Sequence, residues 1–194
     1  MTMTVGLFCF PEMEMLDFAG PYQVFATASR LASGDTYGLF RLVSIGTTVD
    51  PVRVRGGAVI LPEATIADHP VLDALVIPGG RAGVDAQIQG GEAVKWIRAQ
   101  ADSVPIIASV CTGAFLLAET GLLDGLQATT HSDHVNDLRR TFPALDVVES
   151  LRWVDSGHFV TSAGLSAGID MALHLVERLA SRDLAVSTAR QLEL

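Results

Sequence analysis

Three mostly apolar runs restrict the fold of this chain more than any other feature. They are TVGLFCF (4–10), LDALVIP (72–78) and VPIIASV (104–110). Runs of this kind are typical of strands buried on both faces, which occur in parallel sheets with helices on either side. The first run stops at Pro11, and the second stops at Gly79-Gly80. We therefore expect the runs to form the middle of a parallel sheet.

Helical and strand-like patterns alternate through the rest of the chain. Helical spacing of apolar residues predicts helices over 15–31, 92–101, 113–121, 133–142 and 166–180. Gly20-Pro21 predicts a bend or a restart in the first of these helices. Strand patterns and turn residues predict strands at 40–46 and 126–131, and hairpins at 52–62 and 151–164, the last one turning at 155–157. The alternation predicts an α/β fold with a mostly parallel sheet, helices on both faces and right-handed crossovers.

Composition limits the class of protein. The 194 residues fit a single domain spanning 1–194, and 49% hydrophobic with 18% charged residues favours a compact fold over disorder. A net charge of -9 disfavours nucleic acid as a partner. The N-terminus lacks the basic segment of a signal peptide and no apolar run is long enough for a bilayer, so we expect a cytoplasmic protein without membrane contact.

The two cysteines have different surroundings. Cys9 lies inside an apolar run, as an inert buried cysteine does, and its distance in sequence from Cys111 predicts no disulfide framework. No Cys/His cluster has the spacing of a zinc site, so we expect neither a metal nor a cofactor. Cys111 follows a predicted strand and precedes a predicted helix, flanked by small residues such as Thr112. This is the position of a nucleophile elbow, and the helix N-terminus predicts a lowered thiol pKa.

Other polar and glycine residues fall at the same edge of the predicted sheet, where ligands gather in open α/β folds. Gly79 and Gly80 end a neighbouring strand, and their N–H groups are candidates for binding negative charge. A tight turn is the simpler interpretation of the pair. His131 ends another strand-like segment and is a candidate base or substrate contact.

An acid beside the cysteine is expected from the segment after the first strand. Glu12, Glu14 and Asp17 all lie there. A carboxyl near a thiolate has a raised pKa and can exchange a proton with a substrate. For each acid a solvated charge or a helix cap is the alternative. Asp17 is favoured because it lies between Leu16 and Phe18, where an unpaired carboxylate is costly.

Five segments in order along the chain resemble the ThiJ/PfpI superfamily of class I glutamine amidotransferase-like proteins. They are GLFCFPEMEMLDFAGPYQVF, DALVIPGG, SVCTGAFLLAETGLLDG, ATTHSDH and FVTSAGLSAGIDMALHLVE. The resemblance implies a flavodoxin-like three-layer sandwich, a homodimer, and a reactive cysteine on a nucleophile elbow with a carboxylic acid beside it. Many members place a histidine directly after the cysteine, and this chain has Thr112 there.

Two branches of the superfamily share LDFAGP, VCTG and TTH with this chain: isocyanide hydratases and the ligand-like domains of AraC-type regulators. Resemblance to the hydratases implies that Cys111 attacks an isocyanide, that Asp17 moves protons and that Thr112 orients the site, with an N-substituted formamide as product. A regulator needs a helix-turn-helix segment of roughly a hundred further residues, and the sequence ends at Leu194 in ARQLEL, without the tail common in hydratases.

Three functions therefore follow from the same cysteine. The first is an isocyanide hydratase-like enzyme that acts on a small molecule. The second is a redox or electrophile sensor, in which Cys111 is oxidised under mild peroxide. The third is a small-molecule-binding domain related to the regulators, in which Cys111 persists without turnover.

Overall fold

A computed structural model of the protein describes residues 2–33 and 38–194. Its main sheet contains seven strands in the order β10-β11-β7-β6-β1-β2-β5. Their bounds are Met3–Phe8 (β1), Phe40–Gly46 (β2), Ala64–Thr65 (β5), Ala74–Ile77 (β6), Ile106–Val110 (β7), Trp153–Asp155 (β10) and Phe159–Ser162 (β11). Every neighbouring pair is parallel except β10–β11, which is the predicted hairpin.

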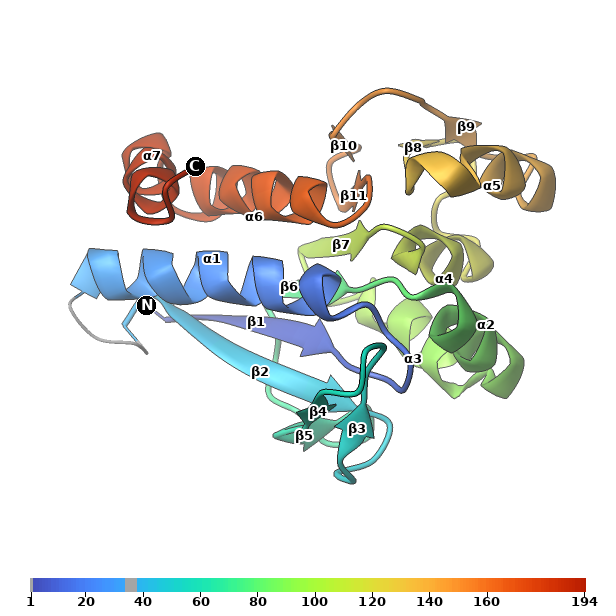
Figure 1. The fold of residues 1–194 in the computed structure, drawn as a ribbon, viewed down its shortest axis with the longest axis horizontal. Coiled ribbons are helices and arrows are strands. Elements are labelled where there is room, and N and C mark those ends of the chain that lie inside the picture. The colour runs from blue at the N-terminus through green and yellow to red at the C-terminus, as the bar shows by residue number, and fades with distance from the viewer. Residues whose placement is uncertain (1, 34–37) are drawn as a thin grey trace.

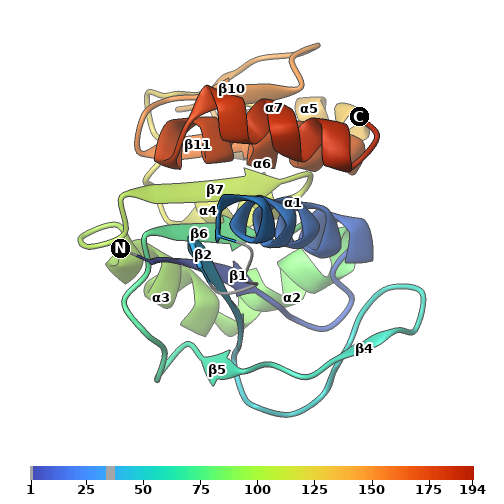
Figure 2. The ribbon, with the colours of Figure 1, turned by 90° about the vertical axis from the view of Figure 1, so that its left-hand side faces the viewer.

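Helices cover the sheet on both sides, so the predicted flavodoxin-like α/β fold is confirmed (Figures 1 and 2). On one face, three helices pack against one another: α1 (Met15–Ser33), α6 (Ser166–Leu179) and α7 (Arg182–Gln191). The other face carries α2 (Arg81–Gly90), α3 (Glu92–Gln100) and α4 (Gly113–Glu119). Beyond α4 lie a 3-10 turn, Ser132–His134, and α5, Val135–Thr141.

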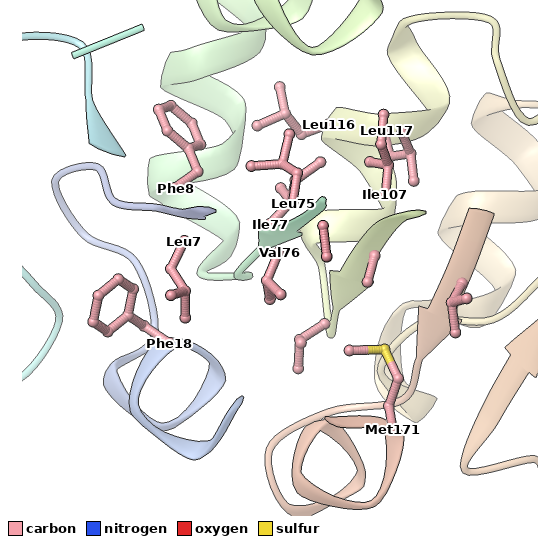
Figure 3. Packing of buried hydrophobic residues seen from close by; sticks show 14 of the residues in the cluster. Leu7, Phe8, Phe18, Leu75, Val76, Ile77, Ile107, Leu116, Leu117 and Met171 are labelled. Atoms are coloured by element: carbon pink, nitrogen blue, oxygen red, sulfur yellow. The ribbon is translucent and has the colours of Figure 1, made fainter. Parts of the chain in front are cut away.

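The core lies in two layers, one on each side of the sheet. Successive residues of a strand alternate between them, as Leu7 and Phe8 do in β1 (Figure 3). Leu117 of α4 lies on one side and Met171 of α6 on the other, and all four side chains are fully buried. Burial on both faces explains why the strands appear in the sequence as continuous apolar runs.

Two short pairs of strands lie outside the main sheet. The predicted hairpin at 52–62 is present as antiparallel β3 (Val52–Arg53) and β4 (Val59–Ile60). The predicted strand at 126–131 is much shorter, since only Gln127–Ala128 (β8) is extended and it pairs with Asp146–Val147 (β9). The residues after β8 turn away to reach the functional site.

Of the predicted bend or restart at Gly20-Pro21, the restart is wrong, because α1 continues through both residues. Proline removes one backbone hydrogen bond, and packing of α1 against α6, α7 and the sheet compensates for it. Gly20 serves close packing: a Cβ there would lie 2.9 Å from Cγ1 of Ile169 in α6. Helices α2 and α7 were not predicted from the sequence.

Candidate active site

Cys111 occupies the sharp turn between β7 and α4. Its φ of 56° lies in the left-handed region, which a non-glycine residue adopts only under constraint. Its N–H donates to the carbonyls of Ser162 (3.1 Å) and Ala163 (3.3 Å), and its own carbonyl accepts from the Thr130 hydroxyl at 2.7 Å. These contacts fix the strained turn that a nucleophile elbow requires.

Asp17 is the carboxyl that meets the cysteine. It lies in the first turn of α1, is fully buried, and hydrogen-bonds the Cys111 thiol. The N–H of Gly79 donates to Oδ2 and the N–H of Leu165 donates to Oδ1, each at 3.1 Å. Burial raises the pKa of Asp17 from 3.8 to about 6, although the two backbone hydrogen bonds and the thiol oppose that shift.

The predicted lowering of the Cys111 pKa is wrong in this structure. Burial, followed by the neighbouring charge of Asp17, raises the pKa of the thiol to about 12, while hydrogen bonds from Thr112 lower it. The cysteine is only 7% exposed, so solvent does little to stabilise a thiolate. At pH 7 the pair therefore holds one proton, on sulfur, with the Asp17 carboxylate as its acceptor.

Gly79 and Gly80 position other groups. Both N–H groups are engaged, that of Gly79 by Asp17 and that of Gly80 by the Thr112 hydroxyl oxygen at 2.9 Å. The prediction that they are free to bind developing negative charge is therefore not met in this conformation. A Cβ on Gly79 would lie 2.7 Å from the Thr112 nitrogen, so this close approach needs glycine.

Thr112 connects Gly80 to the sulfur. Its hydroxyl oxygen accepts from the Gly80 N–H and its hydroxyl proton is donated to Cys111. A donor that is itself hydrogen-bonded is polarised and becomes a stronger donor. The chain of two hydrogen bonds thus favours negative charge on the sulfur.

A cavity of about 550 Å³ opens above the cysteine. Its lining consists of Glu14, Arg55, Gly80, Arg81, Cys111, Thr112, His131, Asp133, His134 and Leu165. Most of these residues are polar, and Asp17 lies beneath them. The cavity is large enough for a small organic molecule.

His131 reaches this cavity as predicted. The N–H of Asp133 donates to its Nδ1 at 3.2 Å, so the neutral ring carries its proton on Nε2. The ring packs directly on Gly164, where a Cβ would lie 2.1 Å from Cδ2. The next residue, Leu165, has a φ of 55° and donates its N–H to Asp17. Strain at both Leu165 and Cys111 marks this site.

The other two candidate acids lie apart from the thiol. Glu14 lines the cavity and forms an ion pair with Arg55 at 3.4 Å. Glu12 is exposed and is not part of the lining. The geometry thus selects Asp17 among the three. In the part of the chain that the structure describes, no group of three His, Cys, Asp or Glu side chains could hold a metal ion.

Cys9 follows β1 and is fully buried, and burial raises the pKa of its thiol to about 12. Its thiol donates to the Ile45 carbonyl at 3.4 Å, away from the cavity.

Several site residues were missed in the sequence. Arg81 follows the Gly-Gly that ends β6, and Leu165 follows a glycine just after β11. Position at the carboxyl end of a parallel strand was an available signal for both. Arg55 belongs to a hairpin, so only the folded chain places it here.

The model of the DJ-1/PfpI family matches residues 3–178. The protein belongs to this family. One DJ-1/PfpI relative, the isonitrile hydratase of Pseudomonas putida, is 35% identical over 193 residues, which cover 100% of this chain and 79% of the relative. The HTH-type transcriptional regulator GbdR of Pseudomonas aeruginosa is 27% identical over 184 residues, 95% of this chain but only 48% of the regulator. The chain thus spans about half of that regulator's length.

Among solved DJ-1/PfpI structures, a ThiJ/PfpI protein from Pseudomonas syringae matches with a TM-score of 0.88 at 27% identity, covering 100% of this chain and 75% of the other. The family therefore contains both an enzyme and regulators that resemble this chain. Within the described part of this DJ-1/PfpI protein, no helix has the length and apolar character to cross a membrane.

Proposed function

We propose that the protein is a cysteine-dependent isocyanide hydratase-like enzyme, which adds water to an isocyanide and releases an N-substituted formamide. One observation carries the proposal: a buried carboxyl, Asp17, hydrogen-bonds the thiol of an elbow cysteine, Cys111, beneath a cavity for a small molecule. Similarity to an isonitrile hydratase over the whole of this chain and 79% of that enzyme supports it. The proposal treats residues 1–194 as one domain, acting as a homodimer and without a cofactor.

The first step needs a nucleophile and a proton acceptor. As the Cys111 sulfur bonds to the terminal carbon of R–NC, Asp17 takes the thiol proton and delivers it to the same carbon. The product is a thioimidate, R–N=CH–S–Cys111. Because the thiol pKa is raised, this step requires Asp17 as the base.

The second step consumes one water. Water adds to the thioimidate carbon while Asp17 takes its proton and passes a proton to the nitrogen. The carbon–sulfur bond then breaks, the remaining hydroxyl proton returns to sulfur, and R–NH–CHO leaves. Thr112 favours charge on the sulfur, and the Nε2–H of His131 donates to the substrate nitrogen or oxygen.

The redox-sensing alternative has less support from the site. Peroxide reacts with thiolate, and a thiol whose pKa is raised by burial and by Asp17 presents little of it. Binding without turnover is favoured by the similarity to regulators over 95% of the chain.

Formamide production from cyclohexyl isocyanide and from isocyanoacetate tests the proposal. Wild type and Cys9→Ala should both release formamide, whereas Cys111→Ala and Asp17→Asn should lose about 100-fold or more in rate. Cys9→Ala is the matched control, since it removes the other buried thiol outside the cavity. If wild-type protein with reduced Cys111 formed no formamide from either compound, hydration would be excluded. Unchanged ligand affinity in an inactive Cys111→Ala would then favour binding alone.

A further inference from the structure

Arg81 is a positively charged residue beside the hydrogen bonds that surround the Cys111 sulfur. It directly follows Gly80, whose N–H donates to Thr112, and Thr112 directly follows Cys111. Arg81 lines the same cavity as Cys111, and 39% of its side chain is exposed. A ligand bound at the sulfur therefore lies in the field of this guanidinium.

The guanidinium of Arg81 is held in place from two sides. Its Cζ lies 4.1 Å from the centroid of the Phe115 ring, and its Nε donates to Oδ2 of Asp85 at 3.1 Å. Phe115 is almost fully buried, and its ring also contacts His134 and Phe142, at 6.3 Å and 6.2 Å between centroids. Stacking and pairing fix the plane of the guanidinium before any ligand arrives.

One terminal nitrogen of the Arg81 guanidinium lacks a hydrogen-bond partner in the described part of the chain. Nη1 is buried and has no hydrogen-bond partner among residues 2–33 and 38–194. A buried donor without an acceptor is costly. A carboxylate in the cavity would accept charge-assisted hydrogen bonds from the exposed part of the guanidinium, and Nη1 would reach it only after the side chain moves toward the ligand.

Arg55 contributes less than Arg81. Its side chain is 68% exposed, and its Nη1 pairs with Glu14 at 3.4 Å. Both arginines are paired with a carboxylate, but solvent screens the more exposed Arg55 more strongly than Arg81. The overall charge of -9 also gives no long-range attraction, so an anionic ligand needs a cation within the cavity itself.

We propose that the cavity above Cys111 binds small organic anions, and that the Arg81 guanidinium holds their carboxylate. For the reaction proposed above, and resting on it, the substrate class is isocyanides that carry a carboxylate. The anion site itself does not depend on hydration, because it is defined by Arg81, Phe115 and the cavity.

Alkylation of Cys111 tests the anion site without any enzyme activity. Iodoacetate and iodoacetamide have nearly the same shape and differ in charge, and mass spectrometry of the Cys111 peptide measures both rates. Arg81→Met should lower the ratio of the iodoacetate rate to the iodoacetamide rate by about 10-fold, since a nearby unit charge is lost. Arg81→Lys should keep most of the ratio, and Arg55→Met should change it less than Arg81→Met.

The matched control is Arg182→Met, which removes the same charge from an exposed position at the start of α7 (Figure 1). This helix packs on the opposite face of the sheet from α2. The iodoacetamide rate at the same cysteine shows whether each variant keeps its folded site. The proposal would be overturned if the ratio of the iodoacetate rate to the iodoacetamide rate in Arg81→Met lay within 2-fold of the same ratio in Arg182→Met.

Turnover of isocyanoacetate and of its ethyl ester then tests the substrate class. Wild type should favour the acid in kcat/KM, and Arg81→Met should reduce that preference about 10-fold with little change for the ester. If neither compound is hydrated but the alkylation ratio depends on Arg81, the anion site stands and hydration is excluded. If both are hydrated without any effect of Arg81, hydration stands and the anion site is excluded.

Discussion

Replacing Asp17 by asparagine tests whether the buried carboxyl destabilises the fold once it is ionised. Asp17 is fully buried, and its pKa rises from 3.8 to about 6 on folding. The native state therefore binds this proton more tightly than the unfolded chain does. The stability from this group is fully present below about pH 3.8 and is lost as the pH rises through about 6. The gap between the two pKa values corresponds to about 3 kcal/mol.

The measurement is urea unfolding of wild type and Asp17→Asn at several pH values and constant ionic strength. Other titrating groups are common to both proteins and cancel in the difference between their free energies of unfolding. From about pH 4 to about pH 7.5, wild type should lose about 2.4 kcal/mol relative to the variant, because the unfolded chain is already partly ionised at pH 4. Most of this change should fall between the two pKa values.

The same comparison in a Cys111→Ala background sharpens the test. The thiol hydrogen bond lowers the pKa of Asp17, so without it the pKa should rise and the loss of stability should be larger. A difference between wild type and Asp17→Asn that stays constant within about 1 kcal/mol over this range, the scale of the extrapolation error, would refute the argument. Burial would then not raise the pKa of Asp17 in the folded protein.

Two further predictions concern activity. In hydration of an isocyanide, kcat/KM should rise with pH through about 6 and then level off, because the reactive form of the Cys111–Asp17 pair holds one proton. A kcat/KM independent of pH across that range would contradict Asp17 as the base. Gly164→Ala should lower kcat/KM about 10-fold to 100-fold by displacing His131. The control Gly90→Ala should match wild type, because its Cβ would meet nothing within 4 Å. Equal kcat/KM values for the two variants would show that His131 has no part in the mechanism.

The sheet was predictable because its strands are buried on both faces. Continuous apolar runs report that burial directly: β6 and β7 lie inside the runs found in the sequence, and β1 begins one residue before its run. Helix α2 was missed because it carries little apolar periodicity, with only Gly83 and Val84 buried. The segment 126–131 resembles a strand, but its polar end turns toward the cavity, where tertiary contacts override local preference.

The neighbours of Cys111 were predictable because parallel strands end at a common edge of the sheet. Asp17, Thr112 and His131 were all expected at that edge. The thiol pKa was not predictable in the same way. The sequence shows a helix N-terminus after Cys111, but the degree of burial and the contact with Asp17 exist only in the fold. These two effects outweigh the hydrogen bonds from Thr112 and reverse the predicted direction.

The two hydrogen bonds to Asp17 come from distant parts of the chain. Gly79 lies 62 residues after the acid and Leu165 lies 148 residues after it. During synthesis, Asp17 and Cys111 both exist long before the donor for the second carboxylate oxygen has been made. A nascent chain or a fragment that ends before Leu165 therefore carries the cysteine and the acid without the N–H group that binds Oδ1 of Asp17. Reactivity at this pair is thus a late sign of folding, which appears only once nearly the whole chain is in place.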